Sequence, residues 1–232
     1  MGWSYEVALT GAAEAGPLAD WFASGPKDAL STLPNLAFLD VYTPATGTAQ
    51  DPYNHDGAGP VMLLMLGFES RESLAAALSS DAIEAALTPL PEGIVASGAA
   101  FERLTYPIGS GSEPAPLSAP FSYVVRYQLP AEDEAAFIEN YIATHPTTQA
   151  HLPGIRAILC YLPLRDLPNP PGLSDPTYLI GNEVAFDDMD AFNHAMASPV
   201  REELREHFRT FPPFSGVNTH HPMQRTRIAG EV

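Results

Sequence analysis

The stretch YIATHPTTQAHLPGIRAI, residues 141–158, has a degenerate copy, WFASGPKDALSTLPNLAF, at residues 21–38. Both copies begin with an aromatic residue, have an alanine two positions later, and reach a Leu-Pro pair shortly before an apolar run. A second match joins GFESRESLAAALSSDAIEAAL, from Gly67, to AFDDMDAFNHAMASPVREEL, from Ala185. Two matches in the same order, 118–120 residues apart, indicate an internal duplication.

The composition is that of a globular protein with a strongly acidic surface. The chain has 232 residues, of which 45% are hydrophobic and 17% are charged, so it can bury a sizeable core. Its 28 acidic residues outnumber 11 basic ones, which gives a formal net charge of −17. Such a field repels phosphate backbones and anionic lipid head groups. We therefore expect neither nucleic acid nor a membrane as partner.

The cysteine content and the N-terminal sequence predict a cytoplasmic protein. The single cysteine, Cys160, cannot form an internal disulfide. No basic N-terminal stretch is followed by an apolar run of the length that a signal peptide or a membrane span requires. Association with further copies of the chain is possible, but no long heptad pattern in the sequence requires it.

The same order of elements is expected in each half of the chain. Aromatic and β-branched runs predict strands, and amphipathic stretches between them predict helices. The order is β-α-β-β-α-β twice, an α+β fold made of two ferredoxin-like units. We expect a degenerate first repeat at 1–108, a linker rich in Gly, Ser and Pro at 109–120 and a second repeat at 121–232. The predicted strands are 3–10, 36–44, 61–69, 96–108, 121–129, 155–164, 177–186 and 215–228.

The third strand of each repeat is apolar on both faces. VMLLMLGF and TYLIGNEVAF are nearly continuous hydrophobic runs, which is typical of strands that are buried on both sides. Helices can cover one face of each sheet, so the other face needs a second partner. We expect the two repeats to pack sheet to sheet within one chain and to enclose a cavity between them.

The second repeat resembles the EthD-like family of α+β barrel proteins. The resemblance rests on Tyr141, His145-Pro146 and LPGIR at 152–156, followed by Phe186, Phe192, Met196 and Ser198-Pro199. It covers residues 120–225 well and residues 3–107 only as a degenerate copy. It implies the fold of a dimeric α+β barrel, here in one chain, and a role in the metabolism of small molecules. It does not specify the reaction, because similar barrels host cyclases, lactone isomerases, decarboxylases and oxygenases.

His145 is the first catalytic candidate. It continues the apolar stripe of the predicted helix, four residues after Tyr141, and its counterpart in the first repeat is Pro26. Because Pro146 disfavours helical geometry at the residue before it, the ring is expected where the helix breaks. A histidine there can exchange a proton near neutral pH without a cofactor. The alternative is a helix cap on a free carbonyl. Tyr141 can donate a hydrogen bond to a substrate carbonyl, or it can be core, as Trp21 is in the first repeat.

The last strand places two histidines next to each other, His220 and His221. Successive strand residues face opposite ways, so one of them faces the cavity. We name His220 as a catalytic candidate and His221 as a substrate-binding one, although the sequence does not say which faces inwards. A metal site is not expected, because no carboxylate-rich or cysteine spacing accompanies the pair. His55 lies in a Pro- and Gly-rich loop expected near the cavity mouth.

Arg126 interrupts the apolar first strand of the second repeat, FSYVVRYQL. It either holds an anionic group of a substrate or pairs with a buried acid, for which Glu183 is the candidate. Glu183 and Tyr123 are the other expected substrate-binding residues.

The absent motifs narrow the chemistry. There is no Gly-x-Gly-x-x-Gly, phosphate loop, Gly-x-Ser-x-Gly or Cys-x-x-Cys, so nucleotide cofactors, serine hydrolysis and thiol redox lack support. The first hypothesis is a cofactor-independent lyase, isomerase or cyclase acting on a small aromatic or polyketide-like carbonyl compound. The second is a non-catalytic protein that binds a hydrophobic intermediate. The third is a haem-binding barrel.

Overall fold

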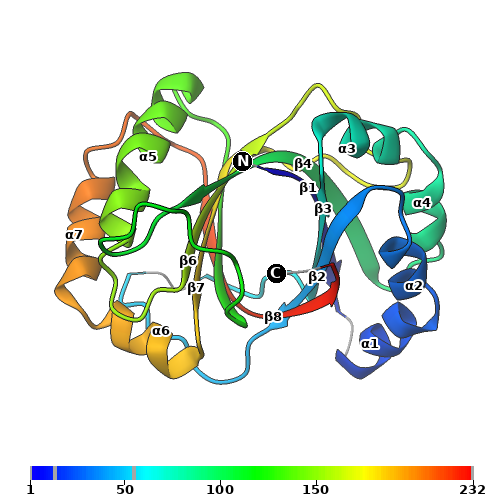
Figure 1. Cartoon of the computed structure of the whole chain (residues 1–232), viewed down its shortest axis with the longest axis horizontal. Coiled ribbons are helices and arrows are strands. Elements are labelled where there is room, and N and C mark those ends of the chain that lie inside the picture. The colour runs from blue at the N-terminus through cyan, green and yellow to red at the C-terminus, as the bar shows by residue number, and fades with distance from the viewer. Residues whose placement is uncertain (1, 13–14, 54–55, 231–232) are drawn as a thin grey trace.

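A computed structural model describes residues 2–12, 15–53 and 56–230, and within them eight strands form one closed barrel (Figure 1). The strand order is β1-β3-β2-β8-β5-β7-β6-β4, and every neighbouring pair is antiparallel. Repeat 1 contributes β1 (Gly2–Gly11), α1 (Ala15–Ser24), α2 (Pro26–Ser31), β2 (Leu36–Pro44), β3 (Met62–Phe68), α3 (Arg71–Leu78), α4 (Ala82–Leu87) and β4 (Ile94–Tyr106). Repeat 2 contributes β5 (Phe121–Gln128), α5 (Glu134–Gln149), β6 (Ala157–Pro163), β7 (Tyr178–Phe186), α6 (Met189–Met196), α7 (Pro199–Phe208) and β8 (Asn218–Ala229).

The expected α+β fold of two ferredoxin-like repeats is confirmed. The four strands of each repeat form half of the wall, and the pairs β2–β8 and β4–β6 join the halves at both edges. The helices of repeat 1 cover one side of the barrel and those of repeat 2 cover the opposite side (Figure 1). Each strand therefore has one face towards its own helices and one towards the barrel interior, which explains why the third strands are apolar on both faces.

Helix α5 differs from the expectation that it breaks at His145. It continues through Pro146 to Gln149, and Asp133 caps its start by accepting a hydrogen bond from the amide of Ala136 at 2.9 Å. The stripe Phe137, Tyr141, His145 and Gln149 repeats every four residues and is buried along its whole length. Packing of this stripe against the sheet outweighs the local preference of the residue before a proline.

Buried side chains of both repeats meet in the barrel interior, and the pocket described below lies outside it rather than between the sheets. Two buried acids of repeat 1 each form an ion pair with arginines of repeat 2. Glu6 pairs with Arg126, and Asp40 pairs with Arg225 and Arg227. The sequence suggested Glu183 as the partner of Arg126, but the partner in the structure is Glu6.

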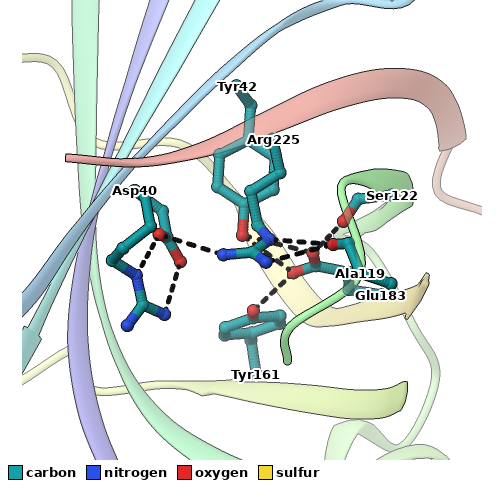
Figure 2. Close-up of polar contacts among 8 residues, drawn as sticks. Asp40, Tyr42, Ala119, Ser122, Tyr161, Glu183 and Arg225 are labelled. Carbon is teal, nitrogen blue, oxygen red and sulfur yellow. Dashed lines mark hydrogen bonds and ion pairs between the residues drawn. The ribbon is translucent and has the colours of Figure 1, made fainter. Parts of the chain in front are cut away.

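Glu183 is held in the interior by hydroxyl groups (Figure 2). Ser122 donates to it at 2.5 Å, Tyr161 at 2.6 Å and Tyr42 at 3.2 Å. Burial raises the pKa of Tyr42 and Tyr161 well above the ordinary tyrosine value, and Glu183 adds to this, so both phenols stay protonated donors. Tyr42 belongs to repeat 1 and Glu183 to repeat 2, so this contact also joins the repeats.

Candidate active site

A pocket of ≈ 230 Å³ lies on the outer face of the repeat 2 sheet, beneath α5 and α7. Its walls come from strands β5, β7 and β8, from the two helices, and from the loop of repeat 1 that joins β2 to β3. The expected location between the two sheets is therefore wrong: the space lies between a sheet and its own helices. The polar groups that line it are Asp51, Tyr53, Tyr123, Tyr127, Tyr141, His145, Gln149, Asn182, Arg201, Arg205, Asn218 and His220.

His145 reaches this pocket from the buried stripe of α5. Its Nδ1 lies 3.3 Å from Nδ1 of His207 on α7, and the two rings stack with their centroids 5.5 Å apart. His145 therefore contacts another side chain, and not a free carbonyl at the helix end as in the alternative prediction. Burial, with smaller contributions from His207 and Arg201, lowers the pKa of His145 to about 3. The ring is therefore neutral at neutral pH and a weaker base than an exposed histidine.

The depressed pKa of His145 predicts acid sensitivity. The unfolded chain protonates this histidine below pH about 6.5, whereas the folded chain resists protonation until pH about 3. Its contribution to stability is thus complete above pH 6.5 and is lost as the pH falls towards 3. Between pH 6.5 and 4.5 we expect the free energy of unfolding to fall by about 2–3 kcal/mol more in the wild type than in His145→Asn.

Urea unfolding at several pH values measures this difference. The control is His194→Asn, which makes the same substitution at an exposed position on α6. Equal slopes for the wild type and His145→Asn would contradict the assignment.

His220 is held by a carboxylate. It lies on β8 with its side chain on the outer face, and Asp56 contacts both its Nδ1, at 2.8 Å, and its backbone amide, at 2.7 Å. The imidazole also stacks on Tyr123 with ring centroids 5.6 Å apart. Burial lowers the pKa of His220, and Asp56 opposes this effect. A carboxylate on Nδ1 fixes the tautomer that leaves Nε2 as proton acceptor.

A second carboxylate from the same loop, Asp51, anchors the loop on repeat 2. Asp51 is buried, accepts a hydrogen bond from Tyr123 at 2.9 Å and pairs with Arg201 at 2.9 Å. Asp51 and Asp56 both precede β3 in repeat 1, yet all their named partners belong to repeat 2. Sequence reasoning missed both acids, because nothing in a single repeat indicates that its loop crosses to the other.

Two amides line the buried part of the pocket. Gln149 donates to Asn182 at 2.8 Å, and Asn182 donates to the carbonyl of Leu159 at 2.9 Å and to Gln149 at 3.2 Å. Both side chains are buried. The sequence alone did not single out this pair, although an amide in the apolar β7 run is a signal that could have drawn attention to it.

Two further predicted residues line the pocket. Tyr141 is fully buried, and its ring contacts those of Tyr127 and His145 at centroid distances of 5.4 and 4.8 Å. Burial raises the pKa of Tyr141 well above the ordinary value, so it can only act as a neutral phenol. Tyr123 lines the pocket through β5 and is engaged by Asp51.

The remaining predicted residues lie elsewhere. Arg126 and Glu183 face the barrel interior, where each has the partners described above. His221 alternates with His220 and faces the other way, against Gly59 and near the Glu6–Arg126 pair. His55 lies outside the described residues. The predicted set therefore divides between the pocket and the barrel interior.

Apolar side chains take the place of the polar lining in the matching cleft of repeat 1. In the alignment of the repeats Leu30 and Leu64 take the places of Gln149 and Asn182, and both are fully buried core residues. The loop between β6 and β7 crosses from repeat 2 and packs Leu164, Leu167 and Leu173 against this core. Asn169 of that loop accepts a hydrogen bond from Tyr5 at 2.7 Å, much as Asp51 does from Tyr123. A loop from each repeat thus covers the cleft of the other repeat, and the cleft of repeat 1 is filled by apolar side chains.

The residues present do not fit haem. A porphyrin is larger than the drug-sized ligands that occupy pockets of about 300–1,000 Å³, whereas this pocket measures ≈ 230 Å³. Of the histidines that line it, His145 is stacked against His207 and His220 is engaged by Asp56. Within residues 2–12, 15–53 and 56–230, no three His, Cys, Asp or Glu side chains gather in a way that could hold a metal ion.

Known structures share this fold at low sequence identity. No protein-family profile and no curated protein matches the chain. An anthrone oxidase-like protein superimposes with a TM-score of 0.61 and 14% identity, over 100% of this chain and 95% of the other. A proposed monooxygenase from Lactobacillus acidophilus gives 0.56 and 10%, over 100% and 99%. A mutant chlorite dismutase from Candidatus Nitrospira defluvii, in complex with cyanide, gives 0.51 and 11%, over 96% and 90%.

These likenesses define the class as an α+β barrel of the dimeric type, formed here within one chain. At such identities they show the fold alone, and the EthD-like resemblance stays a prediction. None of the helices in the described part of the chain has the length and apolar character needed to cross a bilayer.

Proposed function

We propose that this protein is a cofactor-independent acid/base enzyme of the lyase, isomerase or cyclase type, acting on a small aromatic or polyketide-like carbonyl compound. The observation that carries the proposal is the Asp56–His220 pair at the edge of a pocket lined with aromatic rings, amides and a neutral imidazole. A histidine oriented by a carboxylate is a common general base. Its place among tyrosines suits an aromatic ligand.

The reaction step needs only groups that line the pocket and Asp56, which contacts one of them, His220. Nε2 of His220 takes a proton from a carbon next to the substrate carbonyl, the C–H bond breaks, and its electron pair forms the enolate. Asp56 stabilises the imidazolium that results. Neutral His145 and Tyr141 are hydrogen-bond donors for the enolate oxygen. Return of the proton to another carbon gives an isomerase, and loss of a leaving group gives a lyase.

The pocket size supports a ligand of one substituted ring or two small fused rings. An engineered apolar cavity of about 150 Å³ holds one benzene molecule, and this pocket measures ≈ 230 Å³. One fold neighbour is called anthrone oxidase-like, after an aromatic ketone with three fused rings, which is one ring more than this volume supports. Enolate formation is also the first step that direct reaction of such a ketone with oxygen would need, so oxygen uptake belongs in the test.

The experiment is hydrogen exchange into a panel of candidate substrates. The protein is incubated in D₂O with phenolic ketones, lactones and β-keto compounds, and mass spectrometry follows deuterium incorporation and any product, with oxygen consumption recorded in parallel. Exchange or conversion that exceeds a protein-free blank supports the proposal. Compounds that bind but gain no deuterium would instead identify a non-catalytic protein that holds a hydrophobic intermediate, and the proposal would be overturned.

The amide pair provides a variant that closes the pocket without disturbing the fold. Gln149→Leu/Asn182→Leu copies Leu30 and Leu64 of repeat 1, which already pack in the matching cleft. We expect at least a tenfold loss of ligand affinity, with the free energy of unfolding within about 1.5 kcal/mol of the wild type, since both polar partners are removed together. Calorimetric titration and urea unfolding measure the two quantities.

The single variant Asn182→Leu is the matched comparison. It leaves Gln149 buried without its partner, so it should destabilise the protein by about 1–3 kcal/mol. If the double variant is less stable than the single one, the two amides do not act as a pair.

A further inference from the structure

Arg205 differs from the other arginines of repeat 2. It lies on α7, is half-buried and lines the pocket. The other seven arginines of the repeat each form an ion pair with an Asp or Glu, whereas Arg205 forms none with any described carboxylate. In a chain with 28 acids and 11 bases, most arginines are expected to have a carboxylate partner, and among the described arginines only Arg103, which packs over Phe38 in repeat 1, also forms no ion pair.

The surroundings of Arg205 keep its guanidinium available. Glu202 stands one helical turn before it, which is the usual place for an ion-pair partner on a helix. The hydroxyl of Tyr53 donates to Glu202 instead. The ring of Tyr53 meanwhile packs against Arg205, with the guanidinium carbon 4.3 Å from the ring centroid. This cation–π contact fixes the side chain without neutralising its charge.

The neighbouring arginine, Arg201, is already paired with a carboxylate. Arg201, one turn earlier on the same face of α7, is neutralised by Asp51 at 2.9 Å. Among the described residues that line the pocket, Arg205 is thus a cation without a carboxylate partner, at the end where it and Tyr53 are half-exposed. The buried amide pair, Gln149 and Asn182, lies elsewhere in the lining.

We infer that the ligand of this pocket carries a carboxylate, which Arg205 binds at the pocket mouth while the aromatic carbonyl part of the molecule enters between α5, α7 and the sheet. The inference names the substrate class of the proposed function and rests on it. A planar guanidinium binds a carboxylate through two parallel hydrogen bonds. The net charge of −17 disfavours ligands of higher negative charge, so a monoanion fits best.

Matched acids and amides test the inference by binding alone. Isothermal titration calorimetry compares 4-acetylbenzoate with 4-acetylbenzamide, and 2-naphthoate with 2-naphthamide, on the wild type. We expect each acid to bind at least tenfold more tightly than its amide. Arg205→Gln should abolish this preference, and Arg205→Lys should retain part of it. Arg209→Gln is the control, because Arg209 is exposed on the turn after α7 and is paired with Glu206.

Each result either supports or overturns the inference. Equal binding of acids and amides by the wild type overturns it, as does an unchanged preference in Arg205→Gln or no binding of either acid at millimolar concentration. Failure of the enzyme proposal can be distinguished from failure of this inference. If acids are preferred through Arg205 but no compound exchanges deuterium, the ligand class stands without catalysis; if neutral ketones are converted and acids are not preferred, catalysis stands and the ligand class is wrong.

Discussion

Replacing Arg126 with methionine is expected to lower the free energy of unfolding by about 3–5 kcal/mol, because Glu6 would remain buried in the barrel without its cation. Both side chains are almost completely shielded from water, at 4% and 2% exposure, so solvent cannot replace the lost partner. For a chain of this size, the loss corresponds to a fall in melting temperature of roughly 6–20 °C. Urea unfolding and calorimetry measure the two values.

Two further variants show whether the loss comes from the buried charge. Glu6→Leu/Arg126→Met removes both partners and should recover most of the stability, as is usual when apolar groups of similar size replace a buried ion pair. Arg156→Met breaks the Arg156–Asp187 pair, which is about half exposed, and should change the stability by no more than about 1 kcal/mol. An Arg126→Met variant that matched Arg156→Met would show that the interior ion pair contributes little.

Replacing His220 with asparagine is expected to reduce turnover by about 100- to 10,000-fold on whichever panel compound is converted, because general base catalysis contributes a factor of this size. Asparagine keeps a polar group on β8 and cannot accept the proton. Asp56→Asn should lower turnover while the KM changes little, since Asp56 acts through His220 and contacts the substrate only indirectly. Initial rates across substrate concentrations measure both parameters.

The controls for this prediction are a histidine outside the pocket and the fold itself. His194→Asn removes an exposed histidine and should leave turnover unchanged. Circular dichroism and urea unfolding show whether the His220 variant is folded. A folded His220→Asn protein with more than a third of wild-type turnover would refute the role of His220 as base.

Much of the fold could be predicted from the sequence because the repeat and the strand patterns are local. The matching Leu-Pro segments, the alternation in β5 and the doubly apolar β3 and β7 runs are each visible in a few neighbouring residues. The prediction that failed also came from a local rule. Pro146 predicted a helix break, yet burial of Tyr141, His145 and Gln149 along one stripe keeps the helix intact.

The site could be predicted only in part, because its assembly is not local. His145, Tyr141, Tyr123 and His220 line the pocket, and their stripe or alternation was visible in the sequence. The loop residues Asp51 and Asp56 come from the other repeat, and no pattern within a repeat indicates that crossing. Arg126 and Glu183 were drawn into the predicted site because a charged residue in an apolar strand looks the same whether it binds a ligand or another buried side chain.

The exchange of loops between the repeats has a consequence for how such a barrel can change over evolution. In a dimer of identical chains, symmetry places every substitution at two positions, so a change that fills one cleft also fills the other. Joining the copies in one chain removes that constraint. Here the cleft with Leu30 and Leu64 is core, whereas the cleft with Gln149 and Asn182 has a polar lining. One half of such a molecule can thus add to stability while the other half holds a polar pocket.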